Sequence, residues 1–431
     1  MDYLEALNYI NDKNKFGSRL GLDVISKLLD LLGNPHLGMK YIHIGGTNGK
    51  GSVSAYIKTA LEEAGYRVGL FTSPYLERFN ERISINGEDI PNEELARITE
   101  RIKQKIEIML KEGYEHPTTF EIVTTIAFVY FSEQNLDYVV LEVGLGGRAD
   151  STNVIKKPIA SVITNIDYDH VDILGNTLGK IAYEKAGIIK EEGLVISYTQ
   201  QQEALEVLKK VSEEQNAQFI QCPMNDIIIK SIDEFGSIFD FRYNNKIYKD
   251  IKISMLGKYQ ICNAILALCT LLTLRDKNLL NITDNEIRIG LQKTKWNGRL
   301  EILKRNPIFL IDGAHNPQGV KSLVDNLNIF KYNKLILGTG ILKDKDVEHM
   351  VEILAPKADN IIITQVNMPR KMEAEDLEEI INRYNKNTSI EKDIKKAIDK
   401  SYELATEEDL IIFVGSLYLI GDVRKIVLQI N

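Results

Sequence analysis

The clearest indication of the fold is the segment Lys40-Tyr41-Ile42-His43-Ile44-Gly45-Gly46-Thr47-Asn48-Gly49-Lys50-Gly51-Ser52, and a helical pattern over 53–64 follows it. A short apolar strand therefore runs into a glycine-rich turn and then into a helix. Residues 67–71 form the next apolar strand. A strand, a turn, a helix and a second strand in this order make a βαβ unit, which predicts a parallel sheet.

The glycine-rich turn is typical of a phosphate site. Its backbone N–H groups would point at phosphate oxygens, and the positive end of the following helix attracts them. Lys50 would reach the outer phosphates, and the hydroxyl of Ser52 would bind magnesium. The common P-loop pattern has glycine where Ile44 stands and Ser or Thr where Gly51 stands, so the match is imperfect. A purely structural glycine turn is the alternative, which the lysine between strand and helix disfavours.

The alternation of helices and strands continues to residue 295. Two helices are expected within 2–33, around a polar break at Asn11–Ser18. The pattern further predicts helices over 93–112, 119–134 and 258–275 and strands over 138–143 and 159–164. The stretch 197–253 indicates short strands instead, with a hairpin turn at Asn244-Asn245.

A second α/β series follows the segment Lys295-Trp296-Asn297-Gly298-Arg299, which is the best candidate for a domain boundary. This series predicts strand 307–311, helix 317–329, strand 334–338, helix 346–355, strand 359–364, helix 374–384 and strand 409–414. We therefore expect two α/β domains, over 1–295 and 299–431, with a cleft between them.

Composition narrows the function classes. The 431 residues carry a net charge of −8, which disfavours broad binding of nucleic acid or of an anionic membrane. No apolar run approaches the ~18 residues of a spanning helix, and a signal peptide is not expected. The three cysteines form no CxxC pair, which disfavours a disulfide framework and a cysteine zinc site. A cytoplasmic protein with reduced thiols is the expectation.

Polar side chains follow three predicted strands where each strand ends. Ser73, Glu142 and His170 occupy these positions, and ligand sites in α/β sheets form at the carboxyl ends of strands. We expect them to converge beside Lys50. Hydroxyl, carboxylate and imidazole groups suit magnesium bridging to phosphates, although magnesium prefers oxygen. The signal is strongest for Glu142, because a carboxylate that ends a buried strand needs a partner.

The pair Glu184-Lys185 lies where a helix over 182–185 is expected to run into an apolar strand. On the residues alone, a solvated lysine or an ordinary ion pair is the favoured interpretation of Lys185.

Several motifs resemble one known family. Residues 46–52 resemble the Mur-ligase version of the P-loop, and Leu141-Glu142-Val143-Gly144-Leu145-Gly146-Gly147-Arg148-Ala149-Asp150-Ser151-Thr152-Asn153 resembles the second signature of folylpolyglutamate synthases. The other matching segments, in that family's order, are Glu81-Arg82-Ile83, Asp169-His170, Glu184-Lys185-Ala186-Gly187-Ile188, Asn297-Gly298-Arg299, Asp312-Gly313-Ala314-His315-Asn316-Pro317, Leu342-Lys343-Asp344-Lys345-Asp346 and Gly415-Ser416-Leu417-Tyr418. The resemblance to the folylpolyglutamate synthase and dihydrofolate synthase family covers nearly the whole chain.

The resemblance implies an ATP-dependent amide ligase with a P-loop Mur-ligase-type parallel-sheet domain and a smaller, Rossmann-like C-terminal α/β domain. The carboxylate of a folate or of dihydropteroate would take the γ-phosphoryl group of ATP and become an acyl phosphate. The amine of L-glutamate would then attack it and expel phosphate. A monomer with small-molecule substrates and two Mg²⁺ ions is expected.

The resemblance also implies residue roles. The implied ATP contacts are Thr47, Asn48, Gly49, Lys50, Gly51, Ser52, Asn263, Arg299, Asp312 and His315. The implied catalytic residues are Lys50, Glu142, His170, Lys185, Asp312 and His315. The implied metal ligands are Ser52, Ser73, Glu142, His170 and Lys185, with Lys185 as a carbamate, which replaces the solvated-lysine interpretation. The implied folate contacts are Tyr75, Arg82, Thr118, Phe120 and Asp150, and Ser416 is placed near glutamate.

One departure and three alternatives remain. Many family members have histidine where this chain has Tyr75, and a tyrosine there can still stack on a pterin and donate a hydrogen bond. For Phe120, core packing is as well supported as a pterin contact. Another Mur-type ligase of peptidoglycan synthesis would need an extra N-terminal domain, whereas the loop here begins by residue 45. A non-catalytic ATP-binding module would leave Lys185 and the 312–315 segment unexplained, and a nucleotide kinase would not need the second domain.

Overall fold

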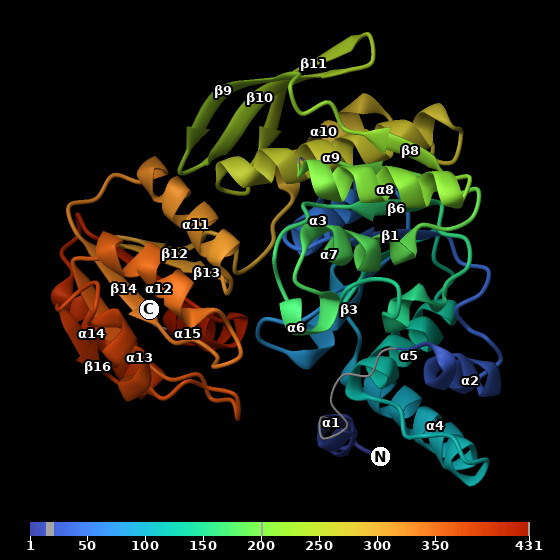
Figure 1. The fold of residues 1–431 in the computed structure, drawn as a ribbon, viewed down its shortest axis with the longest axis horizontal. Helices are drawn as coiled ribbons and strands as arrows, with labels where there is room; N and C mark the ends of the chain where they lie inside the picture. Colours follow the sequence, from blue (N-terminus) through green and yellow to red (C-terminus); the bar gives the residue numbers. More distant parts are fainter. Residues whose placement is uncertain (14–20, 200, 430–431) are drawn as a thin grey trace.

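The computed structural model describes residues 1–13, 21–199 and 201–429, and in them the chain forms two α/β domains beside each other (Figure 1). The N-terminal domain, blue to yellow, occupies the right of the view, and the orange to red C-terminal domain occupies the left. The expected fold class is confirmed, whereas the domain limits at 295 and 299 stay a prediction. Most of the polar break expected at Asn11–Ser18 lies outside the described residues.

The larger sheet is parallel except at one edge. Its strand order is β4-β3-β2-β5-β1-β6-β7-β8, with β3 and β4 antiparallel beside β2. The strands are β1 (Tyr41–Gly45), β2 (Val68–Phe71), β3 (Ile83–Ile85), β4 (Glu88–Asp89), β5 (Tyr138–Glu142), β6 (Ala160–Ile163), β7 (Leu194–Ser197) and β8 (Gln218–Gln221). Every residue of the central strand β1 is buried, which explains why it is apolar except for His43.

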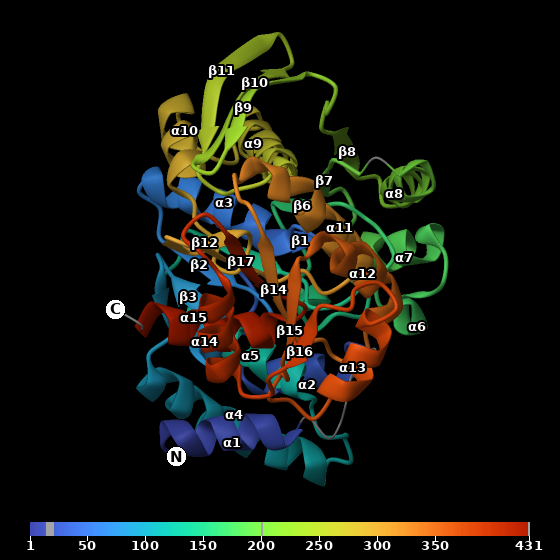
Figure 2. The same cartoon turned by 90° about the vertical axis from the view of Figure 1, so that its left-hand side faces the viewer.

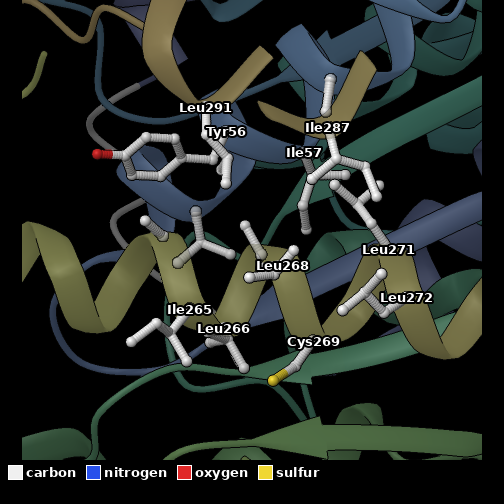
Figure 3. Close-up of a cluster of buried hydrophobic side chains, with 14 of the residues drawn as sticks. Tyr56, Ile57, Ile265, Leu266, Leu268, Cys269, Leu271, Leu272, Ile287 and Leu291 are labelled. Atoms are coloured by element: carbon white, nitrogen blue, oxygen red, sulfur yellow. The ribbon is translucent and has the colours of Figure 1, made fainter. Parts of the chain in front are cut away.

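Helices cover both faces of this sheet. Successive side chains of a strand point to opposite faces. Val140 of β5 accordingly packs with α3 (Lys50–Glu63), α9 (Lys258–Asp276) and α10 (Asp284–Lys293), as Figure 3 shows for the helices. Its neighbour Leu141 packs with the other layer. That layer contains α1 (Tyr3–Asp12), α2 (Asp23–Leu31), α4 (Asn92–Lys111) and α5 (Thr119–Ser132).

The phosphate-loop helix α3 is held closely by α10. A Cβ atom on Gly290 of α10 would lie 2.4 Å from Cα of Ala60 in α3. The two backbones therefore approach more closely than any larger residue at position 290 would permit, which fixes α3 against the rest of the domain.

The stretch 197–253 differs in part from the expectation. The hairpin at Asn244-Asn245 is confirmed, because it joins β10 (Gly236–Tyr243) to β11 (Lys246–Ile253), and β9 (Ile227–Asp233) completes a small antiparallel sheet at the top of Figure 1. The expectation of strands alone is wrong, since α8 (Gln202–Glu214) precedes them. Its buried residues Ala204, Leu205, Leu208 and Val211 recur at helical spacing.

The prediction of an apolar strand directly after residue 185 is also wrong. Helix α7 (Leu178–Lys185) runs into a short 3₁₀ turn over Ala186–Ile188, and the next strand, β7, begins only at Leu194. The apolar residues after Lys185 are buried in a helix-side layer and not in the sheet.

The C-terminal domain is a second twisted sheet between two helical layers, and it faces the viewer in Figure 2. Its strand order is β12-β13-β17-β14-β15-β16, parallel except for β12. The strands are β12 (Glu301–Arg305), β13 (Ile308–Asp312), β14 (Leu335–Thr339), β15 (Asn360–Ile363), β16 (Thr388–Ile390) and β17 (Leu410–Val414). The helices are α11 (Pro317–Asn326), α12 (Val347–Leu354), α13 (Ala374–Ile381), α14 (Ile394–Leu404) and α15 (Leu417–Gln429).

The predicted strands and helices of this domain are confirmed within a few residues at their ends. Elements β12, β16, α14 and α15 were not predicted. In the described parts of the chain, no helix combines the length and the apolar character needed to cross a membrane.

Candidate active site

A cavity of about 260 Å³ lies between the two domains, at the carboxyl ends of their parallel strands. The strands that end there are β1, β2, β5 and β6 of one domain and β13 and β17 of the other. The predicted site residues that line the cavity are Thr47, Asn48, Gly49, Lys50, Gly51, Ser52, Ser73, Glu142, His170, Lys185, Asn263, Arg299, Asp312 and His315. The expected cleft and the expected convergence of Ser73, Glu142 and His170 beside Lys50 are therefore present.

The phosphate loop leads directly into α3. Helix α3 begins at Lys50, three residues before the predicted start, so Lys50, Gly51 and Ser52 form its first turn. The N–H groups of a first turn have no partner within the helix and attract anions. Gly49 precedes them in the left-handed region, at φ +91°, and a Cβ there would lie 2.5 Å from Oδ1 of Asn263. The backbone thus presents donors to the cavity.

Glu142 is the buried carboxylate of the site. It is 5 % exposed, and burial raises its pKa to about 7, against the opposing charge of Lys50 and a hydrogen bond from the Ser73 backbone. Lys50 itself donates from Nζ to the carbonyl oxygens of Gly46 and Thr47, both 3.2 Å away. A carboxylate whose ionised form is costly to bury fits a site that receives a cation.

Lys185 lies under the same loop. Its side chain is buried, its Nζ donates to the Gly46 carbonyl oxygen at 2.8 Å, and it takes part in none of the ion pairs of the described residues. The solvated-lysine interpretation is therefore wrong. Burial, followed by repulsion from Lys50, lowers its pKa to about 7. A large part of this amine is neutral near pH 7.

His170 and its neighbour Asp169 face the C-terminal domain. His170 adopts the left-handed region at φ +49°, and burial lowers its pKa. Asp169 accepts a hydrogen bond from Nδ2 of Asn316 at 3.3 Å and lies 3.9 Å from Nζ of Lys345. Asn316 also donates to Oδ1 of Asn48 at 3.3 Å. These contacts join the two domains around the cavity.

Asn316 and Lys345 had no predicted role. The signal was present, because both belong to the segments 312–317 and 342–346 that resemble family motifs. Sequence reasoning missed Tyr198, Tyr259 and Gln318 altogether, and all three line the cavity.

Asp312 and His315 form the opposite wall. The Asp312 carboxylate accepts from the backbone N–H groups of Leu300 and Ala314, each 2.8 Å away. Burial raises its pKa, and Arg299 opposes the shift. Nδ1 of His315 donates to the Gly313 carbonyl oxygen at 2.8 Å, and burial lowers the histidine pKa to about 4. The imidazole is therefore neutral, with Nε2 left as its acceptor.

Six predicted contacts lie outside the cavity lining: Tyr75, Arg82, Thr118, Phe120, Asp150 and Ser416. The side chains of Asp150 and Thr118 make hydrogen bonds within the protein. Asp150 accepts from the backbone N–H groups of Leu145 and Thr152 and from the Thr152 hydroxyl, and Thr118 caps α5 reciprocally with Glu121. Their predicted folate contacts stay untested.

The aromatic candidates Tyr75 and Phe120 both pack against the core cluster on the α5 side of the sheet, and Phe120 also contacts the glycine loop that follows β5. The Arg82 guanidinium is stacked 5.1 Å from the centre of the Tyr75 ring. A Cβ on Gly144 would lie 2.4 Å from the edge of Phe120, so this ring packs directly on the loop. Ser416 is buried, and its Oγ accepts from the backbone N–H of Tyr418 at 3.3 Å.

The metal donors at the cavity are oxygen-rich but incomplete. The described residues contain no group of three or more His, Cys, Asp or Glu side chains that could hold a metal. Glu142, Ser52, Ser73 and His170 together offer a carboxylate, two hydroxyls and an imidazole along one cavity. Magnesium usually takes one or two carboxylates, waters and substrate phosphates. This donor set therefore fits magnesium that binds together with a nucleotide.

Comparisons with known proteins agree with this geometry. The family described as "Mur ligase middle domain" matches residues 44–271, and "Mur ligase, glutamate ligase domain" matches 298–417. The dihydrofolate synthase/folylpolyglutamate synthase of Bacillus subtilis is 39% identical over 98% of both chains.

Solved structures extend the likeness to the fold. Folylpolyglutamate synthase from Thermotoga maritima has a TM-score of 0.86 at 38% identity, covering 100% of this chain and 97% of its own. The Mycobacterium tuberculosis folylpolyglutamate synthase complexed with ADP and AMPPCP has a TM-score of 0.90 at 29% identity, covering 99% of each chain. On the phosphate loop, the two-domain cavity and these matches, the chain belongs to the folylpolyglutamate synthase and dihydrofolate synthase family of Mur ligases.

Proposed function

We propose that this chain joins L-glutamate to the carboxylate of a reduced folate or a folylpolyglutamate, with ATP as the energy source. The observation that carries the proposal is one cavity with the phosphate loop on one wall and Asp312 and His315 on the other. Relatives that span the whole chain bear the name of this activity.

The chemistry accounts for the parts of the cavity. A carboxylate is a poor electrophile because its leaving group would be oxide, whereas an acyl phosphate has phosphate as its leaving group. Transfer of the γ-phosphoryl group requires positioning and charge neutralisation more than covalent help. The first turn of α3 and the ammonium of Lys50 supply both. The glutamate amine then attacks the acyl carbon, and the bond to phosphate breaks.

Magnesium would be held by Ser52, Ser73 and Glu142 at one position and by His170 at a second. When bound, magnesium neutralises phosphate charge. We further propose that Lys185 carries a carbamate, formed when its neutral amine adds to carbon dioxide and releases a proton. The lowered pKa of Lys185 supports this modification.

Water must be kept from the acyl phosphate, because it hydrolyses readily. Asn48 hydrogen-bonds Gln318 as well as Asn316, and Asp169 lies beside Lys345, so polar contacts join the two domains at the cavity. This junction supports the proposal that the reaction takes place between the domains, away from bulk water.

Dihydropteroate is the second candidate acceptor. Its carboxylate ends at a different depth from that of a folate, and the Bacillus subtilis relative carries both names. We propose a cytoplasmic monomer with small-molecule substrates. The deciding experiment is a side-by-side assay of dihydropteroate and tetrahydrofolate with ATP and glutamate. ADP formation with tetrahydrofolate is expected, and ADP formation with neither acceptor would overturn the proposal.

A further inference from the structure

A chain of four hydrogen-bonded polar side chains runs along the cavity wall, from Tyr198 through Asn263 and Gln260 to Ser52. Asn263 and Ser52 are 2 % and 3 % exposed, and Gln260 is fully buried. Gln260 does not line the cavity, although Asn263 and Ser52 do. Burying an amide costs free energy unless its hydrogen bonds are made, so a glutamine here requires a reason beyond packing.

Both ends of the Gln260 amide are used. Its Nε2 donates to Oγ of Ser52 at 3.2 Å, and its Oε1 accepts from Nδ2 of Asn263 at 3.0 Å. The Tyr198 hydroxyl donates to Oδ1 of Asn263 at 3.4 Å. The direction of the chain follows from Asn263, because its Oδ1 accepts from Tyr198 and its Nδ2 is left to donate to Gln260.

This direction makes Ser52 an acceptor. A serine hydroxyl has two lone pairs and one hydrogen. The N–H from Gln260 occupies one lone pair on the side away from the cavity, which leaves the other available to a cation. The Gln260 amide hydrogen-bonds both the Ser52 hydroxyl and Asn263. Oδ1 of Asn263 in turn lies close to Gly49 of the phosphate loop. One glutamine therefore connects a predicted nucleotide contact to a predicted metal contact.

We propose that Gln260 is a positioning residue of the metal site, acting through Ser52 to orient the hydroxyl that receives the cation. The inference rests on the proposed function, in which Ser52 holds magnesium beside the nucleotide. It predicts that the effect of Gln260 on metal affinity vanishes when Ser52 has no hydroxyl.

The test measures Mn²⁺ binding to the enzyme–ADP complex from the electron paramagnetic resonance signal of free Mn²⁺. Gln260→Met keeps the side-chain length and removes both hydrogen bonds. We expect it to lower Mn²⁺ affinity by about five- to tenfold, the size of one buried hydrogen bond. In a Ser52→Ala background the same change should have no further effect. Gln260→Leu gives the same comparison if the methionine variant does not fold.

Thr270→Val is the matched control. Thr270 lies on the same helix, is fully buried and, among the described residues, hydrogen-bonds only the Leu266 carbonyl oxygen, so its replacement should lower the melting temperature without changing Mn²⁺ affinity. An equal loss from Gln260→Met with and without the Ser52 hydroxyl, or no loss in either background, would overturn the inference. Absence of Mn²⁺ binding in the unaltered protein would instead contradict the proposed function.

Discussion

The indole of Trp296 lies against Gly51, so close that a Cβ at position 51 would fall 2.7 Å from the indole nitrogen. Trp296 belongs to the segment between the domains, and Gly51 belongs to the first turn of the phosphate-loop helix. The domain connection thus packs directly on the phosphate loop, and a planar ring cannot yield as a flexible chain would.

Replacing Gly51 by alanine should therefore displace the loop or the connecting segment. Overpacking of this kind costs about 1–3 kcal/mol, and we expect a lower melting temperature together with a raised KM for ATP. Ser54→Ala is the control on the same helix, because the buried Ser54 hydroxyl has no hydrogen-bond partner within the described protein. Equal ATP kinetics for Gly51→Ala and the unaltered protein would contradict the steric argument.

Lys185→Ala should nearly abolish turnover and should be partly rescued by small carboxylates, which can replace the carboxylate end of a carbamate. The buried position of Lys185 against Gly46 provides the space such a molecule would enter. Steady-state ADP formation with and without added acetate or formate tests this. Normal activity of the variant would refute the carbamate.

His43 should make the fold sensitive to acid. It is fully buried beside Thr152, and burial lowers its pKa from 6.5 to about 3. Between these values the unfolded chain binds a proton that the folded chain does not, so stability falls as pH falls below 6.5. His43→Gln should remove this contribution, about 2 kcal/mol between pH 7 and pH 5. Urea unfolding at both pH values measures it, and parallel losses in the two proteins would contradict it.

Arg424 of α15 should hold the loop that carries Tyr75. Its guanidinium pairs with Glu77 of the other domain and donates from Nε to Glu301 at 2.9 Å, with all three side chains about one-fifth exposed. Arg424→Met should cost roughly 2 kcal/mol of stability and raise the KM for the folate.

The exposed pair of Arg370 with Asp344 provides the comparison, since Arg370→Met should change stability by less than about 1 kcal/mol. Thermal unfolding and folate kinetics of both variants separate the two cases. An Arg424→Met protein with unchanged folate KM would show that the loop is held by other contacts.

Patterns of neighbouring residues in the sequence predicted those features of the structure that depend on neighbouring residues. The strand, turn and helix around Lys50 could be read from apolar runs and glycine, and so could the strands that bring Ser73, Glu142 and His170 together. The need for glycine at position 51 could not be predicted in this way, because the ring that leaves no room for a side chain there belongs to Trp296, far along the chain. The buried state of Lys185 likewise depends on tertiary packing.

The errors have physical causes as well. Helix α8 was missed because the whole stretch 197–253 was predicted as short strands. The buried residues of α8 recur at helical spacing, but the strand pattern that follows them dominates the stretch. Gln260 was missed because a single buried glutamine in an apolar helix has no sequence signature.

The central claim is that this cavity activates a carboxylate for attack by glutamate. The most direct measurement is release of phosphate from ATP in the presence of tetrahydrofolate, with glutamate added or withheld. We expect phosphate release that depends on both the folate and glutamate, with one amide product formed for each phosphate. Release that is the same without glutamate, or with no pterin carboxylate present, would contradict it.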